Sequence, residues 1–198
     1  MLLEGSALTA LVVGGGKVAT RKVRALLAAG AHVRVVAPSI AGELLAMAAG
    51  ESNLTVEQRP FRDDDVRDVA LVFAATDERS INARIARIAR EEHRLVTVSD
   101  SPSEGSFSGM ATHRAGEVIV GVSAGGVPRA AARIRDAIAE RFDDRYATAI
   151  AALRSVRRRL LDSGGDAQWE ATMHRLLDEG FCARVESGAL AAEADAWR

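Results

Sequence analysis

The chain of 198 residues is poor in several residue types, and each shortage excludes a class of protein. Its one cysteine, Cys182, excludes an internal disulfide framework and a cysteine-rich metal site. The four histidines are scattered, with no pair at metal-ligand spacing, so we expect no tight protein-only metal site. No apolar run approaches the roughly 18 residues of a membrane span, and no charged-then-apolar leader opens the sequence. We therefore expect a protein of the reducing cytoplasm.

Neither sign of charge dominates. Lysine and arginine together number 26 and the acidic residues 27, for a net charge of −1 at pH 7. This balance gives no bulk field that would favour a nucleic-acid partner. The basic residues are almost all arginine, and both lysines, Lys17 and Lys22, fall within one glycine-rich segment.

That segment, Leu11–Lys22, is the most informative part of the sequence. An apolar run stops at three glycines, and a helix-forming stretch follows at once. Gly14, Gly16 and Ala19 match the G-x-G-x-x-G/A spacing of a dinucleotide-binding turn, which needs a tight turn, a close backbone approach and a small packing residue. The helix N-terminus then offers unpaired N–H groups and a partial positive charge to phosphates. The spacing predicts a nucleotide site, and a plain structural turn is the alternative.

Strand-like and helix-like segments alternate from residue 9 to about residue 100, which predicts a parallel sheet covered by helices. We expect strands at residues 11–13, 33–37, 54–57, 70–75 and 95–98. We expect helices at residues 17–29, at residues 39–49 with Ser39 as the cap, and after Thr76. In the last of these helices Ile81, Ile85 and Ile88 form one apolar stripe.

The pattern changes after about residue 107. Residues 107–113 and 117–123 are typical of two strands joined as a hairpin, and a helix follows from Pro128 to about Phe142. The remainder is rich in Ala, Arg and Leu with helical periodicity. The sequence therefore predicts an α/β fold with a Rossmann-type parallel sheet over residues 1–110. A hairpin-and-helix segment is expected over 111–145, and an all-helical C-terminal domain over 146–198.

The end of the second strand bears on the choice of nucleotide. In NAD-binding folds an acid about 20 residues beyond the glycines usually holds the ribose hydroxyls. This strand ends at Ala37-Pro38-Ser39 without an acid, so Ser39 and the local backbone would have to serve. No arginine stands at that tip to bind a 2′-phosphate, and the sequence therefore favours NAD over NADP.

Ligands of open α/β sheets bind beyond the carboxyl ends of the strands. The glycine turn, Ala74–Asp77 and Ser99–Pro102 converge there. Asp100 is the candidate for chemistry, because a carboxylate beside a bound dinucleotide can take a proton as a hydride leaves. Asp-Ser-Pro is also common turn chemistry, so position alone leaves both interpretations open. Thr76 is expected to be a cap or turn residue that lines the nicotinamide side.

Several stretches follow one another in a recognisable order. They are Val12-Val-Gly-Gly-Gly-Lys-Val-Ala-Thr-Arg-Lys22, Gly30-Ala-His-Val-Arg-Val-Val-Ala-Pro38, Ala74-Ala-Thr-Asp77 with Asn82, Thr97-Val-Ser-Asp100-Ser-Pro102, and then Phe107, Arg114 and Val122-Ser-Ala-Gly-Gly126. In this order they resemble the N-terminal region of the siroheme synthase family. That family includes stand-alone precorrin-2 dehydrogenases and dehydrogenase/sirohydrochlorin ferrochelatases. The resemblance extends from about residue 9 to residue 142.

The resemblance implies NAD-dependent oxidation of precorrin-2 to sirohydrochlorin, with insertion of Fe²⁺ to give siroheme in the bifunctional members. It implies that Asp100 is the acid/base group of the reaction. It also implies a homodimer, with the hairpin and the following helix as the dimerisation region. The implied cofactor contacts are Gly14, Gly15, Gly16, Lys17, Val18, Pro38 and Ser39.

The departures from the family pattern gather on the tetrapyrrole side. Thr97 replaces the family's asparagine three residues before the aspartate, and Ser123 is the hydroxyl left in the glycine loop. Substrate contacts are expected at Ser123, His113 and Arg114, although His113 alternatively is a solvated hairpin histidine. The dehydrogenase is thus better supported than the chelatase. The alternatives are another small NAD(P)-dependent oxidoreductase and an NAD-binding regulatory module.

Overall fold

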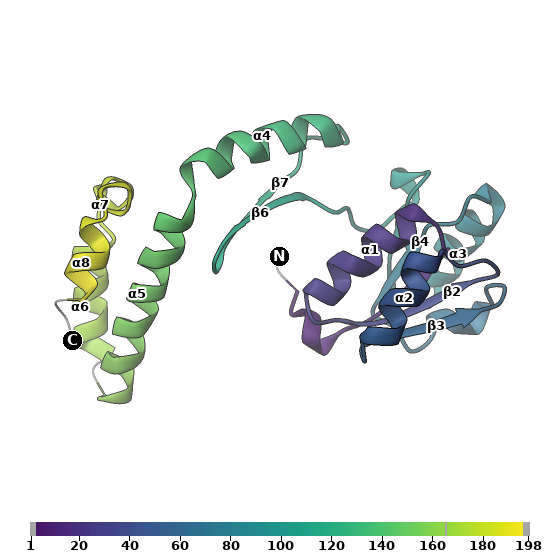
Figure 1. The fold of residues 1–198 in the computed structure, drawn as a ribbon, viewed down its shortest axis with the longest axis horizontal. Coiled ribbons are helices and arrows are strands. Elements are labelled where there is room, and N and C mark those ends of the chain that lie inside the picture. Colours follow the sequence, from purple (N-terminus) through teal and green to yellow (C-terminus); the bar gives the residue numbers. More distant parts are fainter. Residues whose placement is uncertain (1–2, 165, 196–198) are drawn as a thin grey trace. The chain divides into compact units, whose positions relative to one another are not determined.

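The computed structural model describes residues 3–164 and 166–195. The chain divides into two compact units, Met1–Ser108 and Gly109–Arg198 (Figure 1). None of the helices within the described ranges combines the length and the apolar character needed to cross a membrane.

The first unit is built on one parallel sheet of five strands in the order β3-β2-β1-β4-β5. The strands are β1 Thr9–Val13, β2 His32–Ala37, β3 Leu54–Gln58, β4 Leu71–Ala74 and β5 Leu95–Val98. Val13 pairs in register with Val36 of β2 and with Ala74 of β4, so the carboxyl ends of the three central strands lie at one edge. The order reverses between β1 and β4, the place where such sheets bind ligands.

Three helices cover the sheet, α1 Lys17–Ala28, α2 Gly42–Gly50 and α3 Arg79–Glu91. Alternate residues of each central strand serve opposite faces. In β1, Ala10 and Val12 join the core beneath α1 and α2, whereas Leu11 and Val13 join the core beneath α3. Both faces are therefore buried, which explains the continuous apolar strand runs. Each fully buried Val or Leu side chain stabilises the sheet by about 1.5–3 kcal/mol.

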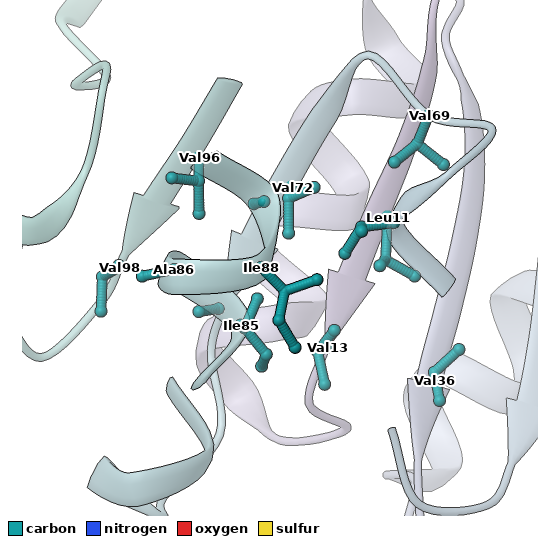
Figure 2. Close-up of a cluster of buried hydrophobic side chains, with 13 residues drawn as sticks. Leu11, Val13, Val36, Val69, Val72, Ile85, Ala86, Ile88, Val96 and Val98 are labelled. Atoms are coloured by element: carbon teal, nitrogen blue, oxygen red, sulfur yellow. The ribbon is translucent and has the colours of Figure 1, made fainter. Parts of the chain in front are cut away.

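The core beneath α3 shows why the isoleucine spacing predicted a helix. Ile85 and Ile88 pack against strand residues that include Val13 and Val72 (Figure 2). Ile81, the N-terminal member of the stripe, packs at the margin of this core and is only partly buried. The apolar stripe therefore reaches the carboxyl edge of the sheet.

Two sequence expectations are wrong in detail. The second helix begins at Gly42 and not at Ser39, because the N–H of Ala41 donates to the carbonyl of Gly15 and holds the preceding residues as a loop against the glycine turn. Phe107 is not part of the hairpin. Its ring packs edge-on against Phe73, with centroids 5.6 Å apart, so this segment belongs to the first unit.

Three 3-10 helices complete the connections, η1 Gly5–Ala7, η2 Asp63–Val66 and η3 Pro102–Glu104. η2 lies in the connection from β3 to β4, and its Asp65 carboxylate is almost fully buried. Arg59 donates to both oxygens of Asp65, at 2.9 and 2.7 Å, and the N–H of Arg62 donates at 2.8 Å. These bonds fix the path of residues 59–65.

The second unit starts with an antiparallel hairpin, β6 Ala111–Ala115 and β7 Val118–Val122, against which α4 Pro128–Arg141 packs. The remaining helices are α5 Asp144–Asp162, α6 Asp166–Leu176, α7 Phe181–Ser187 and α8 Ala189–Asp195. Their shared core includes Tyr146, Leu153, Leu176, Val185 and Leu190.

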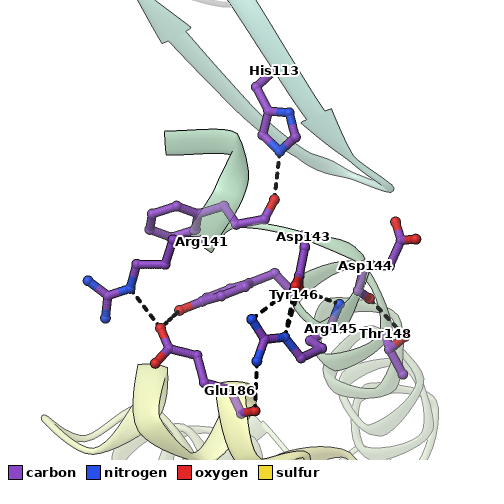
Figure 3. A network of polar contacts seen from close by, with 9 residues as sticks. His113, Arg141, Asp143, Asp144, Arg145, Tyr146, Thr148 and Glu186 are labelled. Atoms are coloured by element: carbon purple, nitrogen blue, oxygen red, sulfur yellow. Dashed lines mark hydrogen bonds and ion pairs between the residues drawn. The ribbon is translucent and has the colours of Figure 1, made fainter. Parts of the chain in front are cut away.

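A polar network joins the elements of this second unit (Figure 3). The Glu186 carboxylate on α7 accepts from the Nε of Arg141 at 2.7 Å and from the hydroxyl of Tyr146 at 2.9 Å. Burial, together with the neighbouring Cys182 and Glu186, raises the pKa of Tyr146 to about 12. The network ties α4 and α5 to α7.

Candidate cofactor site

A cavity of about 720 Å³ opens at the carboxyl edge of the sheet in the first unit. It lies where the strand order reverses, and five segments line it. They are the turn from β1 to α1, the loop after β2, the loop after β4, the connection from β3 to β4, and the first turns of α3. Its lining residues include Gly14, Gly15, Gly16, Lys17, Val18, Pro38, Ser39, Pro60, Phe61, Thr76, Asp77, Ile81 and Arg84.

The glycine turn is too close to its neighbours for side chains at two of its positions. A Cβ on Gly14, whose φ is +128°, would lie 2.2 Å from the carbonyl oxygen of Ala75. A Cβ on Gly15 would lie 2.0 Å from the carbonyl oxygen of Ser39. The backbone of the turn is therefore packed closely between the loops that follow β2 and β4.

Gly16 differs from the other two glycines, because a Cβ there would meet nothing within 4 Å. Gly16 is the N-cap of α1 and brings no capping side chain, so the first N–H groups of the helix are left for a ligand. Such a terminus attracts anions through its N–H groups and the helix dipole. The residues present therefore fit a pyrophosphate, and Lys17 adds a positive charge beside it.

The cavity is also lined by residues that the sequence did not identify. Pro60 and Phe61 come from the connection held by the Arg59–Asp65 pair, and Ile81 and Arg84 come from one face of α3. The guanidinium of Arg84 lies 2.8 Å from the Asp63 carboxylate. The sequence offers one indication of the two α3 residues. Because α3 follows β4, its first turns must flank the carboxyl edge of the sheet.

The loop after β4 is fastened to α3 by Asn82, whose side chain is fully buried. Asn82 Oδ1 accepts from the N–H of Thr76 at 3.1 Å and from its hydroxyl at 2.8 Å. Asn82 Nδ2 donates to the Thr76 carbonyl at 3.0 Å. Thr76 thus lines the cavity while its polar groups bond within the protein.

Asp100 lies just beyond the end of β5, the strand next to β4. It is not among the described residues that line the cavity. Its side chain is 37% exposed, and Oδ2 lies 3.9 Å from Nε of Arg79, the first residue of α3. Arg79 also forms an ion pair with Glu104. The carboxylate is therefore accessible, and a positive charge lies near it.

The predicted substrate contacts lie in the second unit. His113 and Arg114 are on β6, and Ser123 follows β7. The Nε2 atom of His113 lies 2.6 Å from the carbonyl oxygen of Phe142 (Figure 3), a bond in which the ring nitrogen must be the donor. Arg114 and Ser123 are exposed. The role of these three residues as substrate contacts stays a prediction.

Lys22 is the other basic residue of the glycine segment. Its ammonium lies 5.8 Å from the centroid of the Phe73 ring, on α1 beside the sheet. Burial, with the nearby charge of Arg21, lowers the pKa of Lys22.

Across residues 3–164 and 166–195, no cluster of three or more metal-ligating side chains is found.

Comparison with known proteins identifies the family to which the first unit is similar. The profile of a family described as "Putative NAD(P)-binding" matches residues 1–109. The siroheme synthase of Nitrosospira multiformis is 42% identical over 119 residues, which are 59% of this chain and 25% of that protein. The siroheme synthase of Ectopseudomonas mendocina is 42% identical over 124 residues, 63% of this chain and 26% of that protein. The chain thus spans about a quarter of the length of these relatives.

A solved structure of SirC, precorrin-2 dehydrogenase, is similar over both units. It matches with a TM-score of 0.80 and covers 99% of this chain and 98% of that chain, at 23% sequence identity. The two proteins share a fold: a Rossmann-type parallel sheet, an antiparallel hairpin and a set of C-terminal helices.

Proposed function

The chain belongs to the siroheme synthase N-terminal family, since it matches the "Putative NAD(P)-binding" profile over residues 1–109 and is 42% identical to a siroheme synthase over 119 residues, and from this premise we propose that it oxidises precorrin-2 to sirohydrochlorin. The observation that carries the proposal is the joint placement of two features. The cofactor cavity opens at the ends of β1, β2 and β4, and Asp100 follows the adjacent strand β5. A carboxylate beside a nicotinamide site suits proton removal during dehydrogenation.

Different residues of the first unit bind different parts of the cofactor. Gly14 and Gly15 shape the turn, while Gly16, Lys17 and Val18 present the N-terminus of α1 to the pyrophosphate. Pro38 and Ser39 flank the adenosine end, and the Thr76 loop flanks the nicotinamide end. When bound, the oxidised nicotinamide supplies a hydride acceptor.

Asp100 takes the proton that remains when the tetrapyrrole loses two hydrogens as a hydride and a proton. Its exposure lets it reach a substrate, and Arg79 places a positive charge near the carboxylate. Fe²⁺ enters the proposal as a second substrate. Metal insertion requires the pyrrole N–H groups to lose protons, and Asp100 is again the candidate base.

The cofactor we propose is NAD and not NADP. Among the described residues that line the cavity, the cations are Lys17 and Arg84. Lys17 begins α1 at the phosphate turn, and Arg84 is already paired with Asp63 at 2.8 Å. Neither cation is free at Ser39 to bind a 2′-phosphate.

We also propose that residues 111–145 form a homodimer contact, with residues 1–110 as the cofactor domain and 146–198 as a helical domain. Within the described residues the hairpin is a sheet of only two strands, so its outer edges present backbone groups with which strands of a second copy can pair. Ile134 on α4 is 49% exposed and Val127 before it 56% exposed, which leaves apolar surface for a partner.

The test is anaerobic turnover with enzymatically prepared precorrin-2. NAD or NADP is added, and NADH or NADPH is followed together with the tetrapyrrole spectrum. Formation of NADH with sirohydrochlorin supports the dehydrogenase, and a further spectral change on adding Fe²⁺, above the uncatalysed rate, supports the chelatase. Binding of NAD without turnover contradicts the proposal and favours a regulatory module or another substrate.

A further inference from the structure

Asn82 is the most unusual polar residue of the first unit, because its side chain is fully buried within a helix that otherwise buries apolar groups. A buried amide without partners destabilises a fold, so its bonds must be accounted for. Within the part of the chain that the structure describes, all hydrogen bonds of its side-chain amide go to Thr76, six residues earlier in the chain.

The Asn82 amide replaces a missing strand partner. At the end of β4, the N–H of Ala75 still donates to Val13 at 2.8 Å, whereas Thr76 lies beyond the ladder. Asn82 takes the N–H of Thr76 with its oxygen and the carbonyl of Thr76 with its nitrogen, as a neighbouring strand would. The backbone of Thr76 is therefore held at two points.

The hydroxyl of Thr76 is used inside the same loop. It donates to Asn82 Oδ1 at 2.8 Å and accepts from the N–H of Glu78 at 3.2 Å. Thr76 thus offers a ligand a fixed surface of the cavity and not a free hydrogen-bonding group. The role expected for Thr76 depends on Asn82.

The hydrogen bonds between Asn82 and Thr76 also bear on Asp100, the candidate base. α3 begins at Arg79, directly after this loop, and Arg79 lies 3.9 Å from Asp100 and pairs with Glu104. A shift of the Thr76 loop would move the first turn of α3, and with it the cation that lies near Asp100. Small displacements of positioned groups can reduce rates by about 100-fold.

We propose that Asn82 is a positioning residue for the nicotinamide end of the cofactor site. It fixes the Thr76 wall of the cavity directly and the Arg79–Asp100 pair through the start of α3. This inference rests on the nicotinamide-binding part of the proposed function and does not depend on the identity of the substrate.

The test compares Asn82→Ala and Asn82→Asp with Ile85→Val, a matched change on the next turn of α3 that leaves the loop untouched. NADH binding is measured by fluorescence, and amide hydrogen exchange over residues 75–79 is measured in the protein without cofactor. Both Asn82 variants should weaken NADH binding by about tenfold or more and speed exchange at Thr76. Ile85→Val should change neither, because it leaves the bonds between Asn82 and Thr76 intact.

A second pair of variants keeps the inference testable if Asn82→Ala folds poorly. Thr76→Val loses the hydroxyl bonds to Asn82 and Glu78 and should bind NADH more weakly, whereas Thr148→Val loses an exposed hydroxyl bond to Asp144 in the second unit and should bind NADH as the unmodified protein does. Equal NADH binding by the Asn82 variants and the unmodified protein would overturn this inference alone. Failure of the unmodified protein to bind NADH would overturn the proposed function, and this inference with it.

Discussion

The Nε atom of Arg79, at the start of α3, lies 3.9 Å from Oδ2 of Asp100, at the end of β5. The two residues come from neighbouring connections at the carboxyl edge of the sheet, one of which lines the cofactor cavity. The side chain of Arg79 is 50% exposed, so the pair contributes only about 0–1 kcal/mol to stability. What the pair provides is a positive charge near a carboxylate that substrate can reach.

Asp100→Asn is expected to lower kcat by about 10²–10⁴-fold, because the amide cannot take a proton. NADH affinity and Tm should stay close to those of the unmodified protein, since Asp100 does not line the cavity. Turnover with precorrin-2 and NAD, together with NADH fluorescence, measures both effects.

Glu104→Gln is the matched control, because it removes a carboxylate that pairs with the same arginine. It should retain most of the turnover. Full activity in Asp100→Asn, or an equal loss in Glu104→Gln, would mean that Asp100 is not the base.

Gly16→Ser should separate cofactor binding from folding. Serine is a good N-cap, and the Cβ position at Gly16 is open, so Tm should be unchanged or slightly higher. The new hydroxyl would compete for the N–H groups of α1 that we assign to the pyrophosphate. NADH affinity should therefore fall by about tenfold, the equivalent of 1.4 kcal/mol.

Gly50→Ala, at the far end of α2 and also in open space, is the control and should bind NADH normally. Gly14→Ala should behave differently from both, since its Cβ would lie 2.2 Å from a carbonyl oxygen and the fold itself would suffer. Unchanged NADH binding by Gly16→Ser would contradict the assignment of the α1 terminus to the phosphates.

The glycine turn and the central strands could be predicted because their constraints are local. A strand buried on both faces is apolar throughout. Gly14 and Gly15 are required because a Cβ atom at either position would lie 2.2 Å or less from a carbonyl oxygen. The β3–β4 connection could not be predicted, since Phe61 reaches the cavity through a path set by the Arg59–Asp65 pair. The unit that contains Phe107 could not be predicted for a similar reason. It depends on the packing of Phe107 against Phe73, which lies far away in the sequence.

The Arg59–Asp65 pair makes stability depend on pH at the acidic end. Burial alone would raise the pKa of Asp65, but hydrogen bonds from Arg59 and the Arg62 N–H, and the charges of Arg59 and Arg34, outweigh it and lower that pKa below 3.8. In acid the unfolded state therefore takes up the proton first. The stabilisation is complete above about pH 4 and is lost as the pH falls through the lowered folded pKa.

Asp65→Asn is expected to reduce the free energy of unfolding by about 2 kcal/mol at pH 7, less than for a fully buried pair because Arg59 keeps some contact with solvent. Asp64→Asn, next to it, removes an exposed pair with Arg67 and should cost about 0.5 kcal/mol or less. Urea unfolding at pH 7 and pH 3 measures both variants. The deficit of Asp65→Asn should shrink at pH 3, and a constant deficit would show that the loss is not electrostatic.

Tyr146 gives the opposite pH dependence in the second unit. Burial, Cys182 and Glu186 raise its pKa from 10.0 to about 12, so at alkaline pH the unfolded state loses its proton first. Stability should therefore fall between pH 10 and pH 12. Tyr146→Phe should cost about 1 kcal/mol at pH 7, through the lost bond to Glu186, and its disadvantage should diminish across that window. Because Tyr146 is the chain's single tyrosine, tyrosinate absorbance reports its ionisation directly, and a transition near pH 10 in the folded protein would contradict this burial.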